Sequence, residues 1–208
     1  MPSLVMRRQE AVAEIFLIFA EFFKYPSRSF FDDLKWGNVD NQLKILFKTA
    51  NFNLGVPNFY SFISEFSELK STYARCFLGI TKPFALPIES VYKTWTTDPT
   101  VKLPIANSKG YVMGDSAMHI LHLFEHFQLE IPEEYGMMPD HLTILLELYA
   151  FMIGKRSPKE CEIFIKDHFN WLDDFKDALY QVKESGFYLY VLDTLQKVIR
   201  EEQCYLEG

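Results

Sequence analysis

Apolar residues recur every three or four positions along most of the chain, which is the spacing of an amphipathic helix. The clearest case is the stretch from Glu10 to Lys24, which Pro26 ends. Its apolar positions, which share one broad face, are Val12, Ile15, Phe16, Phe19, Phe22 and Phe23. The strict alternation that predicts a β-strand is nearly absent. We therefore expect an all-α protein.

The same periodicity predicts further helices on both sides of one irregular segment. Before that segment we expect short helices at about Phe30 to Leu34 and Asn41 to Ala50, and a longer one from about Asn58 to Phe77. The helices expected after it run from a cap at Asp115 or Ser116 to Gln128, from Pro139-Asp140 to Gly154, from a capping box at Ser157 to His168, and through two final stretches separated near Gly186. The pattern indicates a helical bundle of roughly ten helices.

The irregular segment lies between Gly79 and Val112 and contains Pro83, Pro87, Pro99 and Pro104. Long ordered loops in compact proteins are often functional. We expect one domain over residues 1–208, with an N-terminal helical part at about 1–79, this loop at about 80–112, and a C-terminal helical part at about 113–208.

Composition narrows the class of protein. A chain of 208 residues that is 49% hydrophobic can bury one sizeable core. No long apolar run lacks a charge, so we expect no stable membrane insertion. The three cysteines form no CxxC pair, which fits a cytoplasmic protein without disulfides. The net charge of −7 argues against nucleic acid as a partner and is compatible with a cationic peptide.

Catalysis has no clear candidate, because no nucleotide-binding, metalloprotease or esterase motif occurs. The alternative from spacing is a metal-dependent enzyme built on His119, His122 and His126, which share one face of a predicted helix. That stripe lies opposite the apolar face, so a solvated surface is the preferred interpretation. We expect no metal, no cofactor and no enzyme. A structural helical subunit of a redox complex is a further alternative.

Asp140 and His141 stand at the predicted start of a helix, where backbone N–H groups point outward. Asp140 by itself is a favoured N-cap residue. An unperturbed histidine titrates near neutral pH, so the pair also suits a pH-sensitive polar contact. The residues alone leave both roles open.

Four segments in order resemble the TorD/DmsD family of redox-enzyme maturation chaperones, to which the NarJ group is related. The segments are Tyr73-Ala74-Arg75-Cys76-Phe77, Leu86-Pro87-Ile88-Glu89-Ser90-Val91-Tyr92, Gly114-Asp115-Ser116 and Met138-Pro139-Asp140-His141-Leu142. Ile88 and Leu86 depart from the family pattern, so the resemblance does not specify which reductase is the client.

The resemblance implies an all-helical cytoplasmic chaperone. Members of this family bind the twin-arginine leader, or an equivalent N-terminal segment, of the apo form of a molybdopterin oxidoreductase catalytic subunit. They assist cofactor insertion and assembly before export. The oligomeric state, monomer or dimer, stays open. The peptide-binding residues that the resemblance implies are Asp140, His141, Pro139, Tyr73, Pro87, Ser90, Tyr92 and Gly114.

Overall fold

The computed structural model describes residues 4–208, and this part of the chain is all-α, as predicted. Its α-helices are α1 (Leu4–Phe22), α2 (Arg28–Lys35), α3 (Asn38–Ala50), α4 (Phe66–Phe77), α5 (Glu89–Tyr92), α6 (Asp115–Phe127), α7 (Leu142–Met152), α8 (Pro158–His168), α9 (Leu172–Tyr180) and α10 (Gly186–Glu207). Two 3₁₀ helices, η1 (Phe59–Phe62) and η2 (Glu133–Tyr135), add to these. None of the helices in this part is long and apolar enough to span a bilayer.

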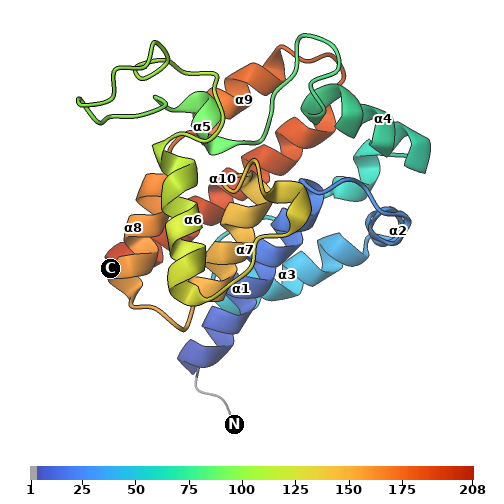
Figure 1. Cartoon of the computed structure of the whole chain (residues 1–208). Helices are drawn as coiled ribbons and strands as arrows, with labels where there is room; N and C mark the ends of the chain where they lie inside the picture. Colours follow the sequence, from blue (N-terminus) through green and yellow to red (C-terminus); the bar gives the residue numbers. More distant parts are fainter. Residues whose placement is uncertain (1–3) are drawn as a thin grey trace.

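Helix α1 is the central element of the bundle. It packs chiefly against α7 and α3 and also contacts α10, and these helices lie together in the middle of the molecule (Figure 1). Every residue of its predicted apolar face is buried. The Phe16 and Tyr149 rings lie 4.5 Å apart at the contact with α7. The apolar face read from the sequence is therefore confirmed.

Local contacts specify several helix ends, and those at Ser157 and Gly154 confirm the predictions. Ser27 caps α2 by accepting a hydrogen bond from the Phe30 N–H. Ser157 and Glu160 form the predicted capping box at α8. Gly154, just after α7, has a φ of 77°, a conformation that favours glycine and stops the helix.

The single helix predicted from Asn58 to Phe77 is wrong, because the chain breaks between η1 and α4. Ile63 is extended, with φ −133° and ψ 123°. The Ser64 backbone N–H and hydroxyl then donate hydrogen bonds to the Glu68 carboxylate at 3.1 and 2.9 Å. These contacts start a new helix at Phe66. Apolar spacing continues across the break and conceals it.

The predicted cap of α6 is also wrong. Gly114 occupies the N-cap position, and no side chain caps this helix. The Asp115 carboxylate instead accepts a hydrogen bond from the Thr97 N–H at 2.8 Å, and so attaches the preceding loop to α6. A Cβ at position 114 would lie 2.6 Å from the Trp95 carbonyl oxygen, so the close approach of the loop requires glycine here.

A buried ion pair joins the beginning and the end of the helical bundle. The Arg8 guanidinium on α1 lies 2.6 Å from the Glu202 carboxylate on α10. The Tyr149 hydroxyl donates a second hydrogen bond to Glu202 at 3.3 Å, and the Tyr205 ring lies beneath the guanidinium. Burial raises the pKa of Glu202, and the Arg8 charge opposes that shift.

Breaking this pair should destabilise the protein strongly, because one buried charge would lose its partner. We expect Arg8→Met to lower the free energy of unfolding by about 3 kcal/mol. Arg7→Met is the matched control, because Arg7 is exposed, and its effect should stay within about 0.5 kcal/mol. Urea unfolding followed by circular dichroism measures both. Equal losses in the two variants would show that the pair contributes nothing specific.

Candidate functional site

The loop between α4 and α6 is attached to the start of α7 by a short backbone bridge. Ile88 and His141 form an isolated antiparallel bridge. The Leu142 N–H donates to the Pro87 carbonyl at 2.8 Å, and the Glu89 N–H donates to the Asp140 carbonyl at 3.1 Å. Two segments of the predicted site, residues 87–90 and 139–141, are therefore neighbours in space.

The Asp140 side chain strengthens this joint from within. It is 0% exposed, and its Oδ2 accepts hydrogen bonds from the Ser90 N–H at 2.7 Å and the Ser116 hydroxyl at 3.3 Å. One carboxylate thus connects α5, α6 and the start of α7. Burial raises its pKa, and the hydrogen bonds from Ser90 act in the opposite direction. The sequence suggested that Asp140 starts the helix. In the structure it does not, because His141 holds the N-cap position.

His141 caps α7 with its imidazole ring. Its Nδ1 accepts a hydrogen bond from the Thr143 N–H at 3.2 Å, and its ring centroid lies 4.9 Å from that of Tyr135. The side chain is only 5% exposed, and burial lowers its pKa to about 3. Of the two roles that the sequence left open, burial therefore disfavours titration near neutral pH. Since Nδ1 accepts, the neutral ring carries its proton on Nε2.

A groove of about 640 Å³ opens beside His141. It lies between the end of α1, α4, the segment around η2, and α7. We call it the His141 groove. Its lining residues are Lys24, Tyr25, Tyr73, Leu78, Pro132, Glu134, Tyr135, Met138, His141 and Glu147. Its size falls within the range of ligand sites in proteins.

The His141 groove combines an apolar lining with an acidic rim. Tyr25 is 60% exposed, and its ring meets the Tyr73 ring edge-on at 5.5 Å. The Tyr73 hydroxyl donates to the Phe23 carbonyl at 3.2 Å, and burial raises its pKa. Lys24 is held between Glu21 at 2.5 Å and Glu147 at 2.7 Å. With Glu134 on the same rim, negative charges outnumber positive ones.

Of the residues that the resemblance implied, His141 and Tyr73 line this groove, and the others lie behind it. Pro87, Ser90, Pro139 and Asp140 form the joint or adjoin it. Gly114 accommodates the loop, and Tyr92 stacks on Trp171 with ring centroids 5.3 Å apart. The groove residues that sequence reasoning missed are Lys24, Tyr25, Leu78, Pro132, Glu134, Tyr135, Met138 and Glu147. One local signal could have revealed Tyr25: it directly precedes Pro26, which ends the first helix, and so leaves an aromatic residue at the helix end.

The three histidines of α6 do not converge. His119 Nδ1 lies 2.9 Å from His168 Nε2, and His168 Nδ1 lies 2.8 Å from the buried Glu89 carboxylate. Burial lowers the pKa of His119, and the neighbouring His168 lowers it further. Within residues 4–208, no group of three or more His, Cys, Asp or Glu side chains is placed to hold a metal ion. The stripe therefore does not form the metal site considered above, because His119 is engaged with α8.

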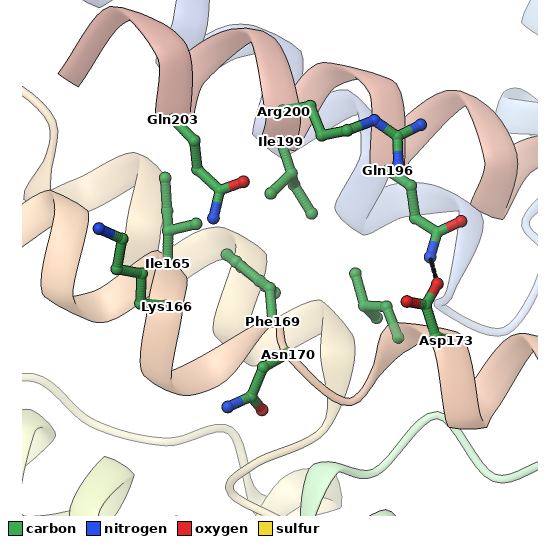
Figure 2. Close-up of a pocket in the computed structure, with 10 residues that line it drawn as sticks. Ile165, Lys166, Phe169, Asn170, Asp173, Gln196, Ile199, Arg200 and Gln203 are labelled. Atoms are coloured by element: carbon green, nitrogen blue, oxygen red, sulfur yellow. Dashed lines mark hydrogen bonds between the residues drawn. The ribbon is translucent and has the colours of Figure 1, made fainter. Parts of the chain in front are cut away.

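A second groove lies between α8, the start of α9, and α10 (Figure 2). Its volume is about 310 Å³. Apolar Ile165, Phe169 and Ile199 lie at its centre, and Gln196 donates to Asp173 at 2.7 Å at one end (Figure 2). It contains none of the residues implied by the resemblance.

Removing the Asp140 carboxylate should loosen the loop. We expect Asp140→Ala to lower the free energy of unfolding by about 2 kcal/mol, because the buried Ser90 N–H loses its acceptor. Hydrogen exchange at the Ser90 amide should accelerate accordingly. Asp140→Asn keeps an oxygen as acceptor and should cost less in both measurements. An unchanged Ser90 exchange rate in Asp140→Ala would contradict the role of the carboxylate in the joint.

His141 should make stability depend on pH. Its folded pKa of about 3 lies below the ordinary value of 6.5, so its contribution is complete above pH 6.5 and is lost as pH falls toward 3. Between pH 6.5 and 5.0 the loss should be about 2 kcal/mol, measured by urea unfolding. His141→Asn, which keeps a capping side chain, should remove that part of the pH dependence. The exposed His122→Asn should not; if both variants behave alike, His141 is not the source.

Comparisons with known proteins identify the family of this chain. The model of the nitrate reductase delta subunit family matches residues 50–184, a range that contains the joint and most of the His141 groove. Among curated relatives, the chaperone protein TorD of Shewanella pealeana is 25% identical over 68% of this chain and 62% of its own length. The TorD proteins of Shewanella piezotolerans and Vibrio parahaemolyticus are 27% and 25% identical, over 59% and 68% of this chain and 54% and 65% of their own lengths.

All three relatives are named chaperones. The chain spans less than two thirds of the length of each. The resemblance drawn from the four sequence segments is confirmed, since the family model covers well over half of the chain. The chain therefore belongs to the nitrate reductase delta subunit family, which includes the TorD and NarJ type of chaperone.

Proposed function

We propose that this protein is a redox-enzyme maturation chaperone that binds the N-terminal leader of a molybdopterin oxidoreductase catalytic subunit in the His141 groove. The observation that carries the proposal is this groove, with its aromatic lining and acidic rim, next to the Asp140-His141 joint of a family member. The client would be bound in its apo form, in the cytoplasm, before export. The protein itself would supply neither a cofactor nor a catalytic group.

The charge of the groove suits a peptide with paired arginines. Glu21 and Glu147 share the one cation of this rim, Lys24, and Glu134 has no ion-pair partner within residues 4–208. A guanidinium entering the groove would find the partly buried Glu147 carboxylate, where charge-assisted hydrogen bonds are stronger than in water. The overall charge of −7 favours the approach of such a peptide.

The apolar part of the groove suits the hydrophobic stretch of a leader. Tyr25, Leu78 and Met138 present apolar surface from three different elements. Aromatic side chains bury large area with little loss of conformational freedom, so they are effective in peptide grooves. His141 would contribute its Nε2–H as a donor to a peptide carbonyl, because Nδ1 already accepts from Thr143.

In this proposal Asp140 does not contact the peptide but positions the residues that do. Its carboxylate is buried behind the groove, so a bound peptide would meet His141 and Tyr73, and Asp140 would hold them through the joint. Pro87 and Ser90 act in the same way, through their backbone groups. Tyr92 and Gly114 would stabilise the loop that carries the joint.

Binding of a synthetic leader peptide to the purified full-length protein tests the proposal. The peptide should carry two consecutive arginines and an apolar stretch, and isothermal titration calorimetry gives the dissociation constant. We expect Tyr25→Ala and Glu147→Gln each to weaken binding by about tenfold, the effect of losing a central aromatic or charged contact. Replacing both arginines by glutamine should weaken binding more than either variant does.

Two exposed positions outside the groove provide matched controls. Tyr111→Ala and Glu125→Gln remove the same side-chain types from the loop and from α6, and both should bind like the unchanged protein. An equal loss of peptide affinity in a groove variant and in its control would show that the peptide binds elsewhere. A chain that binds no leader but co-purifies with a redox enzyme at every stage would be a structural subunit instead.

A further inference from the structure

A second aromatic site lies away from the His141 groove, where α2 meets α3 and η1. A pocket of about 290 Å³ there is lined by Trp36, Gly37, Asp40, Val56, Pro57 and Tyr60, together with Lys35 and Asn41. Trp36 is 76% exposed and Tyr60 is 54% exposed. Gly37 has a φ of 70°, and a Cβ there would lie 3.9 Å from the Tyr60 ring, so the tight turn brings the aromatic wall close to the backbone.

The lining of this pocket includes the nearly buried carboxylate of Asp40. Asp40 is only 6% exposed, and its Oδ1 accepts a hydrogen bond from the Phe59 N–H at 3.1 Å. Its Oδ2 has no hydrogen-bond partner within the described residues. A buried carboxylate oxygen without a donor is costly, because it has lost water and gained nothing in exchange. The side chain of Asp40 would thus be stabilised by a cation that the chain does not supply.

The cation that lines this pocket is engaged elsewhere. Lys35 lines the pocket, but its ammonium donates to the Ser64 carbonyl at 2.7 Å and makes no ion pair with Asp40. Burial raises the pKa of Asp40, as expected for a carboxylate without a nearby positive charge. The pocket therefore combines one buried carboxylate with two exposed aromatic side chains.

We infer that this pocket binds a cationic side chain, an arginine in preference, of a partner polypeptide. Trp and Tyr faces attract cations, and a planar guanidinium can stack on an indole while its edge donates hydrogen bonds toward a carboxylate. The exposed position of Trp36 has no role in the core of the bundle, and exposed aromatic patches mark interaction sites. The site shares no residue with the His141 groove and goes beyond the function proposed for it.

The experiment uses N-acetyl-L-arginine amide as the probe and N-acetyl-L-citrulline amide, its uncharged counterpart, as the comparison. Both are titrated into the full-length protein while the indole N–H signal of Trp36 is followed by NMR. We expect weak, saturable binding of the arginine probe with a shift of the Trp36 signal, a weaker effect with added salt, and no saturation with citrulline. Trp171, which is buried in the core, should give an unchanged signal.

Substitutions separate the site from the overall charge. Asp40→Asn keeps an oxygen to accept from Phe59 and should weaken arginine binding about fivefold to tenfold. Trp36→Ala should weaken it by a similar factor; because this variant lacks the Trp36 signal, its binding is followed by the line shape of the probe. Asp177→Asn removes one exposed negative charge on α9 and should leave affinity unchanged. Thermal unfolding of each variant establishes that it is folded.

The inference is overturned by equal responses to arginine and citrulline, by the absence of a Trp36 shift, or by equal weakening in Asp40→Asn and Asp177→Asn. These results do not depend on the leader. Arginine binding here without leader binding would overturn the proposed function and support this site. Leader binding without arginine binding would support the proposed function and overturn this site.

Discussion

The Asp140 carboxylate is fully buried without a cation beside it, and three segments distant in sequence converge on it. Removing an ionised carboxylate from water costs several kcal/mol unless donors replace the lost hydration, and here a backbone amide and a hydroxyl replace it at Oδ2. Two backbone hydrogen bonds between residues 87–89 and 140–142 surround it. Together they set the loop against the first turn of α7. Since His141 caps that turn and also lines the groove, the shape of the groove depends on this joint.

Much of the fold follows from local sequence, because amphipathic spacing and caps act within a few residues. The apolar face of α1 and the capping box of α8 were both predicted from neighbouring positions alone. The break before α4 was not predicted, because apolar spacing continues across Ile63 and Ser64. The start of η1 just before it is fixed by Asp40, which accepts from the Phe59 N–H across 19 positions. A pattern of apolar residues cannot reveal a partner at that distance. His119 shows the same limit, since its partner His168 lies on another helix.

The candidate site was predictable only in part, for a related reason. The resemblance pointed to Asp140 and His141, but it did not distinguish a residue that lines a groove from one that supports it. That distinction depends on burial, which is a property of the assembled bundle. Lys24 and Glu147 look like ordinary surface residues of two helices in sequence, and they become one rim only because α1 and α7 pack together. Long-range packing therefore determines most of the groove.

The buried carboxylates of the protein show how burial is made tolerable. Glu202 meets Arg8 at 2.6 Å, Glu162 meets Lys166 at 2.6 Å, and Glu89 meets both Lys93 and His168. Asp140 has no cation; its Oδ2 accepts from two donors at the joint, and its Oδ1 has no hydrogen-bond partner among the described residues.

Asp40 resembles Asp140 in having no cation and one oxygen without a partner in the described part of the chain. The two carboxylates differ in where they lie. Asp140 joins three segments inside the fold, whereas Asp40 lines a pocket together with the exposed Trp36 and Tyr60. Asp140 therefore serves the architecture of the protein, and Asp40 is placed where a partner from outside can approach it.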